Sequence, residues 1–160
     1  MTDIVICGAE WSETYATLHH SCFTKAWNES MMRQTLLLPG SIGFIAFENE
    51  IPVGLLIFAF SIDADIVTFG IIPEYRGKHI SDTLMKNALD YLKQQGIENV
   101  FLEVAVNNPH AIDVYQRTGF ETVGKRPNYY VHGTEKIDAL IMKKELKVYI
   151  NYAVQGQPSS

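Results

Sequence analysis

The chain has 160 residues, the size of one ordinary domain and enough to bury a hydrophobic core. With 47% hydrophobic and 19% charged residues, its composition excludes extensive disorder. The net charge of −5, without a basic run, argues against a general nucleic-acid binder and suits a cationic substrate better.

Hydrophobic periodicity and turn residues predict the elements of the first half of the chain. In chain order these are a strand at 4–7, helices at 12–23 and 28–38, and strands at 42–47, 53–60 and 64–72. The breaks between them fall at Pro39 and Gly40, at a turn over residues 49–52, and at Pro73.

The second half begins with a strongly amphipathic helix. Its apolar residues Ile80, Leu84, Ala88 and Leu92 recur every four positions, and Gly96 is suited to cap its end. The remaining predicted elements are a strand at 99–106, a helix at 109–118, and strands at 120–131 and 136–146.

The order βααβββαβαββ predicts a single α/β domain over residues 1–147. Such an order indicates a mixed, mostly antiparallel sheet with helices on both faces. Residues 148–160, which end in a run of small and polar residues, are predicted to form a flexible C-terminal tail.

Neither a membrane span nor a signal peptide is expected. The longest uninterrupted apolar stretch, Leu55 to Phe60, is far too short to cross a bilayer, and the first residues lack a basic and then apolar pattern. We therefore expect a soluble, cytoplasmic protein without a membrane partner. The histidines and cysteines show no metal-ligand spacing, so no metal site is predicted. Cys7 and Cys22 are expected to be buried free thiols, with a disulfide as the alternative.

Three segments contain residues that are suited to chemistry. The first is the strand-to-helix loop from Ile71 to Ser81, in which Gly77 stands between Arg76 and Lys78. A helix start offers unpaired N–H groups and partial positive charge, which can hold phosphate. A plain turn with solvated basic residues is the alternative.

The second is Glu103, an acidic residue inside an apolar strand. Strand alternation places it on the same face as Phe101 and Ala105. It suits a general base whose pKa is raised by partial burial, and an exposed or ion-paired carboxylate is an equally good interpretation.

The third segment runs from Asn108 to Tyr115. Asn108 is suited to cap a helix, Pro109 to begin it and Gly119 to end it. Tyr115 lies about two turns into this helix, where spacing alone favours a core tyrosine.

Together these segments resemble the GNAT superfamily of N-acetyltransferases, and within it the bacterial ribosomal-protein-alanine N-acetyltransferases. The resemblance covers about residues 3–145. Its most specific residues are Leu102-Glu103-Val104, Asn108, Ala111, Tyr115, Gly119-Phe120, Arg126, Tyr129-Tyr130, Asp138-Ala139 and Met142, with Phe23, Trp27 and Pro39-Gly40 in the helical region on the acceptor side.

The resemblance implies an enzyme that uses acetyl-CoA as acetyl donor and needs no metal. The strand residues Phe69, Gly70 and Ile71 would bind the pantetheine arm and thioester through backbone groups, with the Ile71 N–H as oxyanion donor. The pyrophosphate would lie on the loop formed by Arg76, Gly77, Lys78, His79, Ile80, Ser81 and Asp82, and Asn108 would contact the cofactor.

Catalytic and acceptor roles follow from the same resemblance. Glu103 would act as general base, through a water, and Tyr115 as the general acid that protonates the departing thiolate. The aromatic side chains of Trp27, Tyr129 and Tyr130 would form the walls of an acceptor groove.

The phosphate loop departs from the family pattern, Q/R-x-x-G-x-G/A. His79 stands in place of a glycine that permits close backbone approach, and Ser81 replaces a small apolar residue or glycine. Asp82 adds a negative charge. Ser81 is compatible with a helix cap or a phosphate donor, and His79 with an obstacle or a ligand.

The predicted reaction is acetyl transfer to a primary amine, the N-terminal α-amine of a protein such as a ribosomal protein. A second hypothesis is a GNAT that acts on a small amine or a lysine. A third, motivated by His79 and Ser81, is a degenerate module that binds coenzyme A without catalysis.

Overall fold

The computed structural model describes residues 1–147. The strands are β1 (Thr2–Ile6), β2 (Ser41–Glu48), β3 (Ile51–Phe60), β4 (Ala64–Ile71), β5 (Asn99–Ala105), β6 (Glu121–His132) and β7 (Glu135–Glu145). The α-helices are α1 (Ser12–Cys22), α2 (Glu29–Leu37), α3 (Ile80–Gln94) and α4 (Pro109–Arg117). The predicted order and fold class are confirmed; the 3₁₀ turns Ala9–Trp11 and Pro73–Tyr75 were not predicted. The tail predicted over 148–160 lies outside the described residues.

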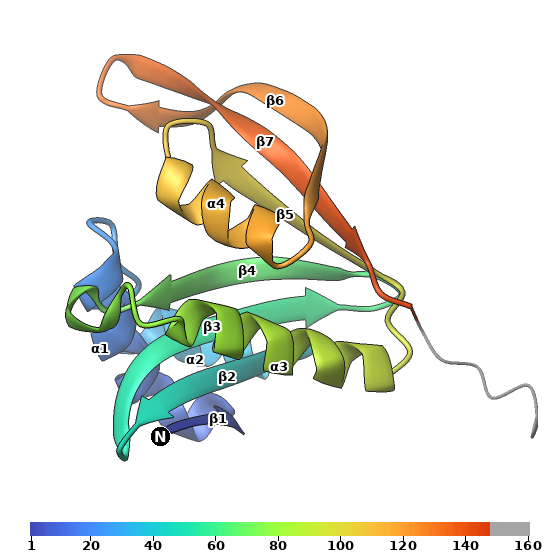
Figure 1. Ribbon diagram of the computed structural model, residues 1–160. Coiled ribbons are helices and arrows are strands. Elements are labelled where there is room, and N and C mark those ends of the chain that lie inside the picture. Colours follow the sequence, from blue (N-terminus) through green and yellow to red (C-terminus); the bar gives the residue numbers. More distant parts are fainter. Residues whose placement is uncertain (148–160) are drawn as a thin grey trace, which may run out of the picture.

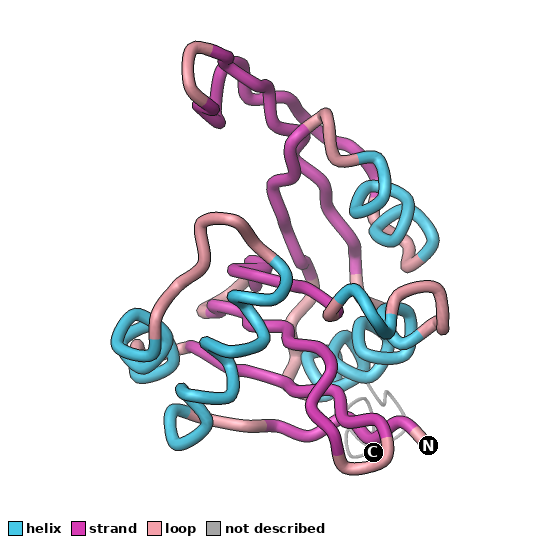
Figure 2. The backbone as a smooth tube through the Cα atoms, turned by 90° about the vertical axis from the view of Figure 1, so that its left-hand side faces the viewer, coloured by secondary structure: helices cyan, strands magenta, loops and turns pink. Residues whose placement is uncertain are grey.

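The seven strands form one sheet in the order β1-β2-β3-β4-β5-β7-β6 (Figure 1). Every neighbouring pair is antiparallel except β4 and β5, which run parallel. That pair shares only two register positions, Ala64 with Val100 and Asp65 with Phe101. Beyond them the strands separate, so the half made of β5, β7 and β6 splays away from the half made of β1 to β4 (Figures 1 and 2).

Helices cover both faces of the sheet, as predicted. The pair α1 and α2 packs on one face, over a buried cluster that contains Tyr15, Met32 and Ile57. The opposite face carries α3 and α4 (Figure 1). Among the helices of residues 1–147, none is long and apolar enough to span a bilayer.

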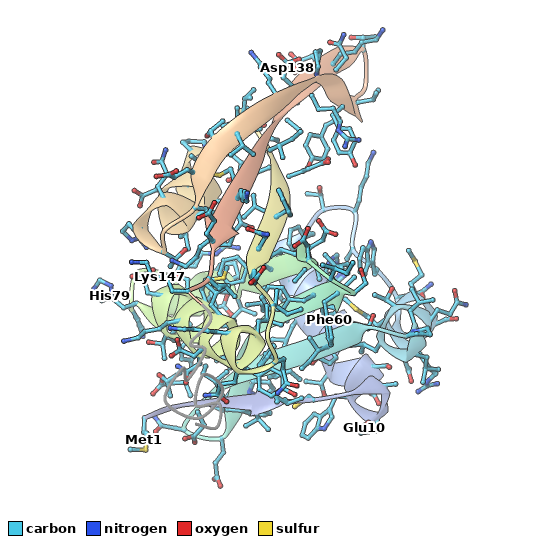
Figure 3. The ribbon with its side chains drawn as sticks, turned by 90° about the vertical axis from the view of Figure 1, so that its right-hand side faces the viewer. Met1, Glu10, Phe60, His79, Asp138 and Lys147 are labelled. Carbon is cyan, nitrogen blue, oxygen red and sulfur yellow. The ribbon has the colours of Figure 1, made fainter. Side chains whose placement is uncertain are left out.

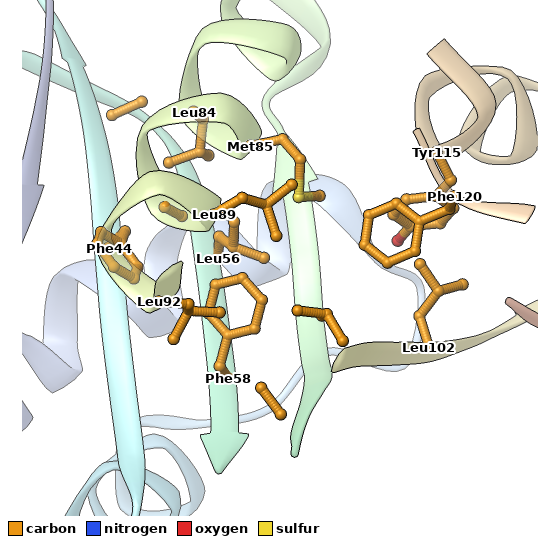
Figure 4. Close-up of a cluster of buried hydrophobic side chains, with 14 of the residues drawn as sticks. Phe44, Leu56, Phe58, Leu84, Met85, Leu89, Leu92, Leu102, Tyr115 and Phe120 are labelled. Atoms are coloured by element: carbon orange, nitrogen blue, oxygen red, sulfur yellow. The ribbon is translucent and has the colours of Figure 1, made fainter. Parts of the chain in front are cut away.

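The larger core lies beneath α3. The helix buries the stripe that its periodicity predicts, Ile80, Leu84, Met85, Ala88, Leu89 and Leu92. These side chains meet Phe44, Leu56 and Phe58 of the sheet, while Leu102, Tyr115 and Phe120 extend the same core toward β5 and α4 (Figure 4). This continuous core fixes the positions of α3 and α4 relative to the split between β4 and β5.

Two local predictions need correction. The turn between β2 and β3 is only Asn49 and Glu50, both with positive φ, and Pro52 belongs to β3 rather than to the turn. Proline fits there because it stands at the second position of the strand, next to a register shift between Ala46 and Phe47. The two thiols are free, but Cys22 is only half-buried while Cys7 is buried.

Candidate active site

The split between β4 and β5 exposes one edge of β4. The Ile72 N–H donates to the Val53 carbonyl of β3 at 2.9 Å. Because backbone groups alternate along an antiparallel strand, the N–H groups of Phe69 and Ile71 point away from β3, toward the split. These are two of the strand residues whose backbone is predicted to bind the pantetheine arm.

A cleft of about 610 Å³ lies at this edge, between the carboxyl end of β4 and the first turns of α3 and α4. Its predicted lining residues are Phe69, Gly70, Ile71, Arg76, Gly77, His79, Ile80, Ser81 and Asn108. The cleft is also lined by residues that were not predicted to belong to it, namely Cys22, Phe23, Tyr75, His110, Ala111, Val114 and Arg117. Two predicted residues, Lys78 and Asp82, do not line it; the Lys78 ammonium lies 5.0 Å from the Tyr75 ring centroid instead.

The start of α3 faces this cleft with unpaired backbone donors. The first helical hydrogen bond runs from the Thr83 N–H to the His79 carbonyl, at 3.1 Å. The preceding N–H groups of Ile80, Ser81 and Asp82 therefore have no partner within the helix, and the helix dipole adds positive potential there. Such a helix start suits a phosphate. Because His79 is the N-cap, the capping role considered for Ser81 is wrong.

His79 adopts the backbone conformation that a glycine would favour. Its φ of 62° lies in the left-handed region, close to that of Gly77 at 79°. The side chain is 87% exposed and lies at the periphery of the molecule (Figure 3), with Nδ1 3.7 Å from an Asp82 oxygen. The substitution thus keeps the loop shape at the cost of backbone strain.

Two arginines set the charge of the cleft. Arg76 donates from Nε to the Ile71 carbonyl at 2.9 Å, which ties the loop to the end of β4. Arg117 of α4 contacts Asp82 of α3 at 3.0 Å and also pairs with Asp113. Arg117 therefore offsets part of the negative charge that Asp82 brings to the phosphate loop, since its own charge is shared with Asp113. Asn108 accepts from the Ala111 N–H at 3.3 Å, so it caps α4 as predicted while it lines the cleft.

A second cavity, a groove, lies on the same split near the start of β4 and measures about 510 Å³. Its lining residues are Asp65, Ile66, Val67, Phe101, Leu102, Glu103, Arg126, Tyr129, Tyr130 and Ile141. Three predicted site residues, Glu103, Tyr129 and Tyr130, are thus brought together. The cleft uses β4 residues 69–71 and the groove uses 65–67, so one strand borders both.

Glu103 projects from the face of β5 that strand alternation predicts, since Leu102 and Val104 are buried on the other face. Its side chain is 26% exposed, and Oε1 forms an ion pair with Nη2 of Arg126 at 2.9 Å. Its other oxygen, Oε2, is buried and has no hydrogen-bond partner among the described residues. An unpaired buried carboxylate oxygen is costly, and it is satisfied when a donor reaches it.

A bulge in β6 shapes the wall of the groove. Arg126 is opposite Ala139 and Tyr130 is opposite Ile137, so three residues of β6 face the single residue Asp138 of β7. The Asn128 N–H donates to an Asp138 oxygen at 2.8 Å, and this bond is the main cause that lowers the pKa of Asp138. The bulge places Tyr129 and Tyr130 together, with ring centroids 5.0 Å apart.

Tyr115 lies on the α4 side of the split. It is only 7% exposed, and its ring centroid is 5.8 Å from those of Phe69 and Phe120. Figure 4 shows Tyr115 beside Phe120. Burial, with a smaller contribution from Tyr130, raises the pKa of the phenol, so Tyr115 carries its proton at neutral pH. The hydroxyl is available as a donor. Tyr115 is not among the residues that line the cleft or the groove.

Trp27 does not line either of these cavities. Its ring stacks on His19 with centroids 4.9 Å apart, and its backbone N–H donates to His19 Nδ1 at 3.0 Å. The other ring nitrogen of His19 lies 3.1 Å from the Thr68 hydroxyl of β4. The ring of Phe23, which lines the cleft, packs on the His19 ring with centroids 4.3 Å apart. His19 thereby ties the loop before α2 to the strand that borders the cleft. The acceptor role of Trp27 stays a prediction.

Gly70 permits this close approach of α1 to β4. A Cβ atom at Gly70 would lie 3.0 Å from the Cys22 sulfur and 3.4 Å from the Phe23 ring. Burial raises the pKa of the Cys22 thiol, although Arg76 opposes the effect. Cys22 is therefore held as a neutral thiol in the wall of the cleft. Among residues 1–147, no three His, Cys, Asp or Glu side chains are grouped to hold a metal ion.

Comparisons with known proteins place the chain among acetyltransferases. The model of the acetyltransferase (GNAT) family matches residues 12–120. A Bacillus subtilis protein with the provisional name ribosomal protein bS18-alanine N-acetyltransferase is 33% identical over 127 residues, which cover 76% of this chain and 81% of that protein. N-alpha-acetyltransferase 50 of Danio rerio is 28% identical over 136 residues, which cover 81% of this chain and 80% of that protein.

The same fold occurs in solved structures. The crystal structure of the ribosomal-protein-S18-alanine N-acetyltransferase from Escherichia coli superposes with a TM-score of 0.86 at 20% identity, covering 94% of this chain and 97% of that one. The chain belongs to the acetyltransferase (GNAT) family. The enzyme class predicted from the sequence, an N-acetyltransferase, is confirmed.

Proposed function

We propose that this enzyme transfers an acetyl group from acetyl-CoA to the N-terminal α-amine of a protein. The observation that carries the proposal is the pair of cavities on the edge of β4: one has the donors for a phosphate, and the other contains Glu103 and two tyrosines. An acetyl donor bound in the cleft and an acceptor amine bound in the groove would meet where β4 and β5 separate.

The residues of the cleft fit acetyl-CoA. The free N–H groups at the start of α3 would hold the pyrophosphate, with Gly77 allowing the loop its left-handed turn. The edge of β4 at Phe69 would pair with an amide group of the pantetheine arm, which leaves the N–H of Ile71 for the thioester carbonyl. When bound there, acetyl-CoA supplies the activated acetyl thioester.

Acetyl transfer then needs one proton removed and one delivered. Glu103, through a water, would take the proton from the acceptor amine at Oε2, its unpaired oxygen. As the amine attacks, the N–H of Ile71 would stabilise the negative charge that develops on the carbonyl oxygen. Tyr115, protonated at neutral pH, would donate its proton to the departing thiolate.

The acceptor groove favours a peptide N-terminus. Tyr129 and Tyr130 give it aromatic walls, which can grip a peptide backbone without demanding one side chain. An α-amine has an ordinary pKa of about 7.7–8.0, against about 10.4 for lysine, so a single carboxylate can deprotonate it far more easily. Two of the related proteins are named as alanine N-acetyltransferases of a ribosomal protein. We extend this substrate class to the present enzyme, in the cytoplasm where ribosomal proteins are made.

The proposal is tested by comparing two acceptors under identical conditions. We expect kcat/KM for a short peptide that begins with alanine to exceed that for spermidine, whose amines are more basic and lack a neighbouring carbonyl. Faster acetylation of spermidine would transfer the assignment to small amines.

A further inference from the structure

Arg126 contacts the proposed base directly. It stands at the edge of the β6 bulge, with Nη2 2.9 Å from Oε1 of Glu103 and its guanidinium carbon 4.9 Å from the centroid of the Tyr129 ring. The side chain is 53% exposed and lines the acceptor groove. It is therefore held on two sides while part of it faces the space that an acceptor would enter.

This ion pair divides the two oxygens of Glu103 between two tasks. Oε1 is bound to Arg126, whereas Oε2 is buried and has no partner in the described chain. A carboxylate held by a guanidinium has a fixed orientation. The oxygen left for the amine and its water is thus determined by Arg126.

The guanidinium also offers donors beside the base. It carries five N–H groups in a planar fork, and the contact with Glu103 uses only one nitrogen. In a peptide N-terminus, covalent geometry separates the α-amine nitrogen from the first carbonyl oxygen by about 3 Å. A base with a hydrogen-bond donor next to it therefore matches an amine with a carbonyl next to it. A lysine or polyamine amine has only methylene groups at that place.

We propose that Arg126 is a specificity-determining residue, which selects N-terminal α-amines by donating a hydrogen bond to the first carbonyl oxygen of the acceptor while it holds Glu103. The inference rests on the proposed function and adds a substrate contact to it. Such a contact discriminates against acceptors that lack the carbonyl. These acceptors displace water from Arg126 and offer no hydrogen-bond acceptor in place of the water.

The test uses Arg126→Met and two acceptors of the same shape. One is a peptide that begins with alanine; the other is the same peptide with its first amide replaced by a trans carbon–carbon double bond. We expect the substitution to lower kcat/KM about 10-fold or more for the amide peptide, as for loss of a hydrogen bond from a charged donor. For the alkene peptide, which reports only the effect of Arg126 on Glu103, the loss should be at least about 3-fold smaller.

The ratio of these two losses separates the roles of Arg126. Because the basicity of each amine is the same for both enzymes, it cancels from the ratio. Equal losses with the two peptides would overturn the proposal and leave Arg126 as support for Glu103 alone. Arg126→Lys keeps the charge and one donor, so its loss on the amide peptide should be intermediate and its loss on the alkene peptide should be small.

Two controls keep the outcomes distinct. Arg33→Met removes an exposed arginine of the same kind, paired with Glu29 at 3.0 Å on α2, and should leave both rates unchanged. Melting temperatures should be similar for all variants, since Arg126 is half-exposed; if Arg126→Met melts early, the comparison rests on Arg126→Lys. Failure of the wild-type enzyme to acetylate the amide peptide would overturn the proposed function itself, whatever the variants do.

Discussion

His19 predicts a specific dependence of stability on pH. It is only 4% exposed, and both ring nitrogens have partners: the backbone N–H of Trp27 donates to Nδ1, so Nε2 carries the hydrogen and donates to the Thr68 hydroxyl. A second proton on Nδ1 would face the Trp27 N–H, and the ring would be charged inside an apolar sandwich. Burial accordingly lowers the pKa of His19 from 6.5 to about 4.

The sign follows from comparing the folded and unfolded chains. The unfolded chain takes up the proton near pH 6.5, and the folded chain only near pH 4. The neutral ring therefore contributes its full stabilisation above pH 6.5 and loses it as the pH falls from 6.5 toward 4. For a shift of this size, His19 should lower the free energy of unfolding by about 2 kcal/mol between pH 7 and pH 4.5.

The assay compares the wild-type enzyme with His19→Leu in urea at a series of pH values, followed by tryptophan fluorescence. Other groups titrate in both proteins, so the difference in unfolding free energy isolates His19. We expect that difference to fall by about 2 kcal/mol as the pH is lowered from 7 to 4.5. His20→Leu removes the exposed neighbour on the same helix and should show no such change. Parallel curves for the wild type and His19→Leu would refute the reasoning.

Four further variants test the cleft and the chemistry. His79→Gly removes about 1–2 kcal/mol of left-handed strain from the folded chain, while the greater entropy of the unfolded chain costs about 0.5–1 kcal/mol. The free energy of unfolding measured in urea should therefore increase, and a decrease would contradict the strain assignment. Its affinity for acetyl-CoA then distinguishes an obstructing His79 (tighter in the variant) from a ligand (weaker). Arg117→Met leaves Asp82 uncompensated beside the phosphate loop and should weaken acetyl-CoA binding, measured as a smaller thermal shift at equal ligand concentration; an unchanged shift would remove Arg117 from the cleft's electrostatics. Glu103→Gln and Tyr115→Phe should each slow transfer about 10²- to 10⁴-fold with little change in melting temperature, and near-normal turnover in both would contradict their roles.

Local sequence patterns were sufficient to predict the α-helices and strands. They also predicted the orientation of residues that depends on a single helix or strand. The four-residue recurrence in α3 predicts its buried face, and alternation in β5 predicts that Glu103 points away from Leu102 and Val104. Asn108 followed by Pro109 predicts the start of α4, and the structure has the cap there.

Residues that act through partners distant in the sequence were harder to predict. Arg117 meets Asp82 across 35 residues, and His19 meets Thr68 across 49, because helix packing and not local spacing brings them together. The bulge at Asn128 has a local signal, because Pro127 and Asn128 are residue types typical of bulges and turns, but its support by the Asp138 side chain depends on the pairing of β6 with β7. Arg126 belongs to the family-like pattern, but its contact with Glu103 depends on the register of three strands.

The central claim is that the acceptor is an N-terminal α-amine, and locating the transferred acetyl group tests it most directly. The substrate is one peptide that has a free alanine N-terminus and an internal lysine, with Glu103→Gln as the control for enzyme dependence. After reaction with acetyl-CoA at neutral pH, fragmentation by mass spectrometry should place the acetyl group on the alanine nitrogen. Acetylation mainly on the lysine side chain would contradict the account.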